Sequence, residues 1–184
     1  YFASMNNYVL PYLIPYLLSA LISALVAYYA WQRRHVSGTK PFVSMVLSQV
    51  LWTVGYTFEL ASPTLQGKLF WDDVQFIASV IWPTAFFAFA WQFSGRHWRH
   101  PRLAWSLINA PFVLFLLLLF TNRWHKLIRA DAWLIPGTPF DILYYDFSFL
   151  VYVTAIYIYG IFASGIYVLT KTFFHAHKLY RRQV

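Results

Sequence analysis

Long uninterrupted apolar stretches are the feature that most constrains how this chain can fold. A helix needs about 20 consecutive apolar residues to cross the hydrocarbon core of a bilayer. Inside lipid, the backbone N–H and C=O groups must be paired within the segment itself, so each stretch of that length is predicted to be a helix. The five predicted spans are Tyr8–Trp31, Pro41–Ala61, Phe70–Phe93, Leu103–Phe120 and Tyr145–Thr170.

The composition agrees with lipid as the main solvent. Hydrophobic residues make up 60% of the 184 residues and charged residues only 11%, whereas a soluble domain carries roughly 25% charged residues. A water-soluble chain of this length cannot bury so much apolar surface in a single core. The predicted fold is therefore an all-α, polytopic membrane helix bundle that forms a single domain over residues 1–184.

The basic residues separate into two unequal groups along the chain. Ten of them fall in 32–40, 94–102 and the tail after residue 170, with no acid among them, while the other four share the remaining loops and helix ends with all six acids. Because cytoplasmic loops carry an excess of Lys and Arg, the first group is predicted to be cytoplasmic, with the N-terminus outside and the C-terminus inside. This topology explains the net charge of +8 without a nucleic-acid partner, and the expected location is the inner membrane of the cell.

The longest predicted external loop covers residues 121–144. Pro136, Gly137 and Pro139 favour turns within it. The loop also contains large apolar side chains, such as Trp133 and Phe140, which are unusual in a linker. We therefore expect a structured cap that folds over the outer end of the bundle.

Polar and aromatic side chains recur at helical spacing in the outer halves of the second and third predicted spans. Trp52, Tyr56 and Glu59 share one face of the second helix, and Asp72 and Gln75 share one face of the third. A charged group at the centre of a span costs roughly 2.5–3.5 kcal/mol on insertion scales, so such groups call for an explanation.

Two explanations of these stripes remain open. The groups could bond one another and hold the helices together, or they could line a pocket that opens to the outside, with Asn122 and His125 near its rim. On the third helix, Pro83 is predicted to produce a kink, and Trp82 is predicted to face other helices. The candidate ligand-binding residues are Trp52, Tyr56, Glu59, Asp72, Gln75, Asn122 and His125.

Sequence patterns typical of enzymes do not occur. The chain has no Cys, no phosphate-binding loop, no G-x-S-x-G and no H-E-x-x-H motif. All His residues except His125 lie near the predicted cytoplasmic boundary among Arg and Lys, which is a poor environment for a metal dication. We therefore expect no catalytic residue, no metal site and no cofactor, and we do not expect this chain to be an enzyme by itself.

An ordered set of motifs over about residues 47–184 resembles a known family, the seven-helix membrane input region at the N-terminus of bacterial sensor histidine kinases. The same set resembles the input region of some diguanylate cyclases. The motifs are Trp52-x-x-x-Tyr56-x-x-Glu59-Leu60, Lys68-x-Phe70-Trp71-x-x-x-Gln75, Pro83, Phe93-x-Gly95-Arg96 and Thr121-Asn122-x-x-His125-x-Leu127.

The resemblance implies a sensor that passes an external or membrane signal to a cytoplasmic output domain. The family has seven spans, so the five predicted here suggest a fragment of a longer chain, without the output domain. Besides the lipid bilayer and that domain, the expected partners include a second copy that binds through the helices or the missing segments. The alternatives are a non-catalytic accessory or structural membrane subunit and a component of a transporter or channel.

The predicted orientation can be tested by labelling, because the native chain contains no Cys. Ser37→Cys lies in the predicted cytoplasmic segment 32–40 and is expected to stay unlabelled by an impermeant thiol reagent in intact cells. Thr138→Cys, in the predicted external loop, is expected to be labelled under the same conditions. Labelling of Ser37→Cys in intact cells would reverse the assigned orientation.

Overall fold

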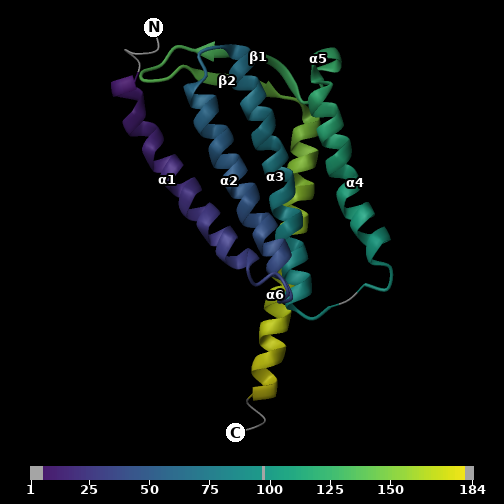
Figure 1. The fold of residues 1–184 in the computed structure, drawn as a ribbon. Coiled ribbons are helices and arrows are strands. Elements are labelled where there is room, and N and C mark those ends of the chain that lie inside the picture. The colour runs from purple at the N-terminus through teal and green to yellow at the C-terminus, as the bar shows by residue number, and fades with distance from the viewer. Residues whose placement is uncertain (1–5, 97, 181–184) are drawn as a thin grey trace.

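The computed structural model describes the backbone of residues 6–96 and 98–180 and the side chains of 9–96 and 98–175. Residue 97 of the predicted cytoplasmic segment 94–102 and the last four residues of the predicted cytoplasmic tail lie outside this description. In the described part of the chain, five long helices form a bundle with a two-stranded hairpin across one end (Figure 1). The elements are α1 (Asn6–Trp31), α2 (Thr39–Ala61), α3 (Leu65–Phe93), α4 (Pro101–Phe120), α5 (Asn122–His125), β1 (Arg129–Ile135), β2 (Ile142–Phe147) and α6 (Phe149–Tyr180).

Two helix starts differ by four or five residues from the sequence-based prediction, whereas the other three differ by two. Helix α3 begins at Leu65 instead of Phe70, because the Thr64 side chain caps it by accepting a hydrogen bond of 3.1 Å from the backbone N–H of Gly67. The predicted fifth span is wrong at its start. Tyr145 lies on β2, whose residues pair with β1, and the helix begins only at Phe149.

Four of the five long helices are long and apolar enough to cross a membrane, and α2 is not among these four. Hydroxyl, amide and carboxyl side chains lower the hydropathy of α2. Three of its buried hydroxyls, on Ser48, Thr53 and Thr57, donate to backbone carbonyls of their own helix. The number of five spans therefore stays a prediction.

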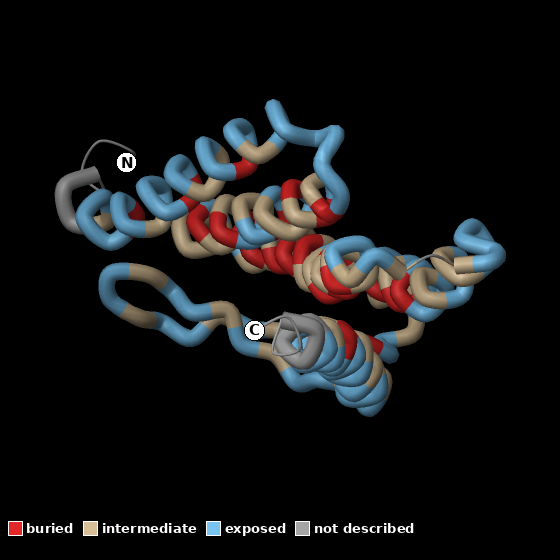
Figure 2. Tube along the Cα trace, turned by 90° about the horizontal axis from the view of Figure 1, so that it is seen from below, coloured by how far each residue is buried: buried red, intermediate tan, exposed pale blue. Residues whose placement is uncertain are grey.

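Helix α3 is central to the bundle. It packs against α2, α4 and α6 and contacts both strands of the hairpin, whereas α1 packs against α2 at the edge. In Figure 2 the buried residues gather in the middle of the bundle, with exposed residues on the outer helices. One core cluster joins α3, α4 and the chain just before β1; it consists of Val80, Phe112, Phe115, Leu119 and Ile128.

Trp82 and Pro83 lie near the middle of α3. The Trp82 ring packs against Phe162 of α6, with 5.3 Å between the ring centroids, as predicted. Pro83 is buried within the helix, and because it has no N–H, the carbonyl of Ser79 loses its intrahelical partner. The predicted kink at Pro83 stays a prediction.

The predicted external loop 121–144 contains α5 and most of a hairpin, so the expected cap takes the form of a small sheet. Strands β1 and β2 are antiparallel, with a register shift between Arg129 and Ala132. The base of the hairpin is closed where Ser148 donates from its N–H to the carbonyl of Ile128, at 3.0 Å, and from its Oγ to the carbonyl of Lys126, at 2.8 Å. This hairpin was not predicted from the sequence.

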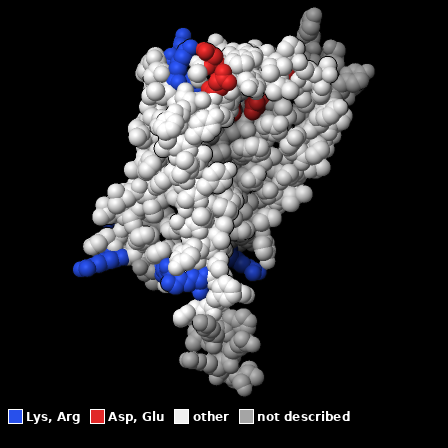
Figure 3. Space-filling view, turned by 180° about the vertical axis from the view of Figure 1, so that it is seen from behind, with Lys and Arg blue, Asp and Glu red and all other residues white. Residues whose placement is uncertain are grey.

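The two ends of the bundle differ in charge. We call the end covered by β1 and β2 the hairpin end. Figure 3 shows Asp and Glu near the hairpin end only, whereas Lys and Arg occur at both ends of the visible face. The cytoplasmic location of the opposite end stays a prediction.

Gly55 of α2 lies at a close approach of α2 to α3. A Cβ atom added there would lie 3.0 Å from Cγ of Gln75 and 3.3 Å from the backbone oxygen of Trp71. We expect Gly55→Val to destabilise the folded protein by about 1–3 kcal/mol through overpacking, measured as a lower Tm in detergent. Gly160→Val is the matched control, because nothing lies within 4 Å of a Cβ at that helical glycine. Equal losses at both sites would contradict this interpretation.

Candidate functional site

The first residue of β1, Arg129, places its side chain inside the hairpin end of the bundle. Only 6% of that side chain is exposed. Its guanidinium forms ion pairs with Asp72, at 3.2 Å, and with Asp73, both in the early turns of α3. It also lies over the rings of Phe76 and Tyr145, 5.6 and 5.3 Å from their centroids. Two carboxylates and two aromatic faces thus compensate a cation that is removed from water.

The second strand of the hairpin contacts the same carboxyl group. The hydroxyl of Tyr145 donates to Oδ1 of Asp72 at 3.1 Å. Burial raises the pKa of Tyr145, and the negative charge of Asp72 raises that pKa further, so the hydroxyl keeps its proton at physiological pH. Both strands therefore bind Asp72, which fixes the hairpin against α3.

A second group of contacts joins α2 to α3. Nε2 of Gln75 donates to Oε2 of Glu59 at 2.6 Å. Lys68 is 1% exposed, and its Nζ donates to the backbone oxygens of Glu59, at 2.8 Å, and Leu60, at 3.3 Å. A cation in this position compensates the negative end of the α2 dipole. Because Gln75 and Asp72 share one face of α3, the two predicted polar stripes meet at the hairpin end.

The predicted aromatic residues, Trp52 and Tyr56, lie next to this network and farther from the hairpin end. Trp52 stacks on Tyr56, with 5.4 Å between ring centroids, and Tyr56 meets Tyr16 of α1 edge to face at 5.3 Å. Trp52 also lines a separate hollow of about 360 Å³ together with Ser79 and Trp82. Glu59 and Gln75 do not line that hollow, which holds only one of the predicted residues, Trp52.

Asn122 and His125 hold the chain that leads into β1. Oδ1 of Asn122 accepts from the N–H groups of Ile128, at 2.8 Å, and Arg129, at 3.2 Å, and its Nδ2 donates to the carbonyl of Arg129 at 2.9 Å. His125 contacts Thr121 Oγ1 through Nε2, at 2.9 Å, and accepts from the N–H of Leu127 through Nδ1, at 3.0 Å. Both side chains therefore help to position the Arg129 backbone.

Arg129, Lys68 and Tyr145 belong to the site but were not predicted as members of it from the sequence. Arg129 was counted only as a basic residue of the outer side, and Lys68 was named besides only in one of the family motifs. A usable signal was present, because Asp72 and Asp73 lie in the first turns of a predicted span and needed a cationic partner nearby. The sequence offers few cations on that side of the predicted membrane.

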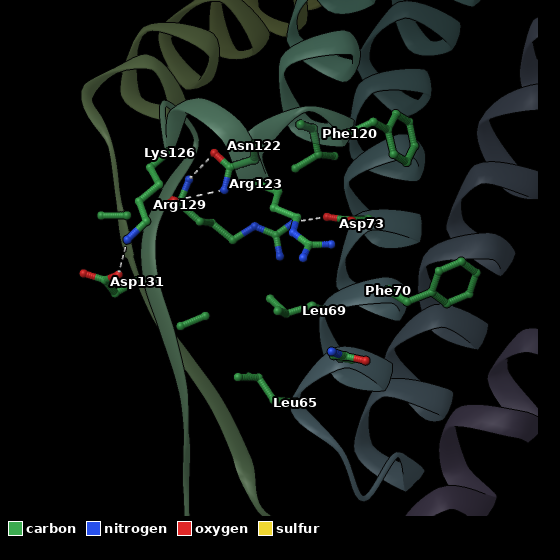
Figure 4. Close-up of a pocket in the computed structure, with 14 residues that line it drawn as sticks. Leu65, Leu69, Phe70, Asp73, Phe120, Asn122, Arg123, Lys126, Arg129 and Asp131 are labelled. Carbon is green, nitrogen blue, oxygen red and sulfur yellow. Dashed lines mark hydrogen bonds and ion pairs between the residues drawn. The ribbon is translucent and has the colours of Figure 1, made fainter.

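A pocket of about 690 Å³ lies between the start of α3, the end of α4 and β1. Figure 4 shows Arg129 reaching from β1 toward Asp73 on α3 at this pocket, with the Lys126–Asp131 pair at its edge. Asn122 also lines the pocket, but His125 does not. The pocket therefore borders the buried ion pairs directly. Its apolar wall is formed by Leu65, Leu69, Phe70, Leu119 and Phe120.

A bundle with four helices able to cross a membrane and a buried polar network at one end defines a multi-pass membrane protein. Residues 15–184 match the family described as the N-terminal 7TM region of histidine kinase. The chain belongs to this family, and it is a transmembrane sensor region of the kind that serves as the input domain of histidine kinases. No curated protein and no solved structure matches the chain significantly.

The ion pairs predict the cost of removing Arg129. Arg129→Gln leaves Asp72 and Asp73 without their buried cation and is expected to destabilise the fold by about 3–5 kcal/mol, measured by thermal or denaturant unfolding in detergent. The control is Lys126→Gln. Its pair with Asp131 is well exposed, with side chains 63% and 71% accessible, so its loss is expected to cost at most about 1 kcal/mol.

A second substitution tests whether the lost stability of Arg129→Gln arises from the carboxylates that are left without a cation. Asp73→Asn introduced into Arg129→Gln is expected to recover part of the lost stability, because one carboxylate is then neutral. If the double variant loses as much stability as Arg129→Gln and Asp73→Asn lose in sum, the broken ion pair is not the cause of the lost stability.

Proposed function

We propose that this chain is the input region of a bacterial two-component histidine kinase in the inner membrane and that it passes an external or membrane signal to a cytoplasmic output domain. The observation that carries this proposal is the buried network at the hairpin end, which connects α2, α3 and both strands. Family membership supports the sensor class, and an output of the diguanylate cyclase type stays a second proposal.

The network has properties that suit signal detection. Glu59, Asp72 and Asp73 supply three carboxyl groups against two cations, Lys68 and Arg129, in two neighbouring groups of contacts that share α3. This imbalance suits a proton, a cation or a hydrogen-bonding ligand arriving from the hairpin end. We propose that such a signal acts at Glu59, Asp72 and Gln75, beside Trp52 and Tyr56, while Asn122 and His125 hold the adjoining turn.

A signal at the hairpin end has a path to the opposite end through α3. The last turn of α3 contacts the loop between α1 and α2, where Oε1 of Gln92 accepts from the N–H of Gly38 and the backbone oxygen of Gln92 accepts from Oγ of Ser37, both at 3.3 Å. Pro83 interrupts the hydrogen bonds of α3 between these two regions. Binding must favour one arrangement of the helices over another to produce a signal. Helix α3 suits this role because it packs against α2, α4 and α6.

The competing proposal is an accessory or structural membrane subunit, in which the same groups only hold α2, α3 and the hairpin together. A transporter or channel component is less well supported, because the connected charges lie at one end of the bundle and not along its length. Glu59 separates the first two proposals, since it can lose its charge with little change in shape.

In the full-length protein, Glu59→Gln is expected to leave expression normal and to change Tm little, because the new amide oxygen can still accept from Gln75. Its signalling output is expected to be lost or constitutive, measured as autophosphorylation of the output domain in membranes. The control is Asp146→Asn, which removes one exposed negative charge at the same end. Unchanged regulation in Glu59→Gln would support the structural proposal.

A structural measurement can test the transmission without a known stimulus. Spin labels at Lys40→Cys on α2 and Thr170→Cys on α6 occupy exposed positions of helices that pack on and around α3. We expect Glu59→Gln to shift the distribution of distances between the two labels, whereas Asp146→Asn does not. Identical distributions in the parent protein and both variants would contradict long-range transmission from the network.

A further inference from the structure

One cation beside the network has no partner in the described part of the chain. Arg123 of α5 is exposed and lines the 690 Å³ pocket. The two other cations of the pocket are neutralised, because Lys126 pairs with Asp131 at 2.7 Å and Arg129 pairs with Asp72 and Asp73. The pocket therefore presents a single guanidinium that is available to an anion from outside the chain.

The opposite side of the pocket is apolar and open. Phe70 and Phe120 each expose 59% of their surface, and both line the pocket. They lie at the start of α3 and the end of α4, two of the helices able to cross a membrane. Trp124, next to Arg123, is 84% exposed, as expected for an aromatic residue at a membrane–water interface. The pocket thus lies where hydrocarbon meets lipid headgroups.

We propose that this pocket binds an anionic phospholipid, with the phosphate on Arg123 and an acyl chain against Phe70 and Phe120. The planar guanidinium of Arg suits two parallel hydrogen bonds to phosphate oxygens. A soluble anion would leave the aromatic wall unused, and a purely apolar ligand would leave Arg123 unpaired. An amphiphile with an anionic head satisfies both features at the depth where lipids place them.

The position of the pocket links this lipid to the buried network. Arg129 and Asp73 line the pocket as well as forming an ion pair. A phosphate held on Arg123 repels Asp73 and attracts Arg129, so lipid binding weakens the contact that fixes the hairpin to α3. This coupling rests on the proposed function, but the binding step does not.

The binding can be measured with the chain in nanodiscs. Gln66→Cys provides a single labelling site, because Gln66 is exposed, lines the pocket and would be the only Cys. With an environment-sensitive fluorophore there, titration of phosphatidylglycerol into phosphatidylcholine discs is expected to give a saturable change. Arg123→Gln should raise the half-saturating mole fraction about fivefold, as expected for the loss of one cation near a lipid surface. Arg102→Gln, an exposed Arg at the opposite end, should leave it unchanged.

Further titrations distinguish a bound lipid from other possible occupants of the pocket. Inorganic phosphate and glycerophosphoglycerol, which lack acyl chains, are expected to produce no saturable change, and an Arg123-dependent response to either would overturn the lipid proposal in favour of a soluble anion. A response that rises linearly with anionic lipid would indicate surface charge alone and would also overturn it. So would a response that follows the number of chains per disc, because the occupant would then be a second copy.

The lipid proposal and the proposed function can fail separately. The same titration in Glu59→Gln is expected to stay saturable and to stay dependent on Arg123, whatever that variant does to signalling. The Tm of Arg123→Gln is expected to match that of the parent, because Arg123 has no partner among the described residues. A lower Tm together with weaker binding would assign Arg123 a structural role and contradict the proposal.

Discussion

The burial of the Arg129 guanidinium between Asp72 and Asp73 determines how one end of the bundle is closed. Water does not drive apolar helices together inside a bilayer, so packing and polar contacts decide their arrangement. The two carboxylates in the early turns of α3 need a partner, and the hairpin supplies it. The Asn122 side chain and the Ser148 contacts both serve this arrangement, because they hold the chain on either side of the hairpin.

A buried ion pair of this type is a modest net stabiliser, because desolvation of the charges offsets much of their attraction. Breaking it by removing one partner is nevertheless costly. This asymmetry is useful in a sensor. The hairpin has one well-defined position on α3, yet a change in the charge around Asp72, Asp73 or Glu59 can alter the relative free energy of that position without unfolding the helices.

The sequence predicts the parts of this site that depend on helical periodicity. Glu59 and Gln75 lie on adjacent helices in chain order, and their spacing was enough to place them face to face, as the 2.6 Å contact shows. Tyr145 and Asp72 are 73 positions apart, and no local pattern relates them. The apolar run around Tyr145 fits a strand as well as a helix, so the strand pairing, and with it the role of Arg129, became visible only in the fold.

The closed base of the hairpin has a consequence for how such an input region can be modified. Ser148 forms hydrogen bonds to Ile128 and Lys126 and so holds the two ends of the hairpin together at its base. The spacing between α4 and α6 therefore does not depend on the length of the turn at the other end of the hairpin. The entropic cost of a longer loop grows only slowly with its length. The turn between β1 and β2 is therefore a natural insertion point, where an added peptide or a small recognition domain can be grafted while the helices below keep their positions.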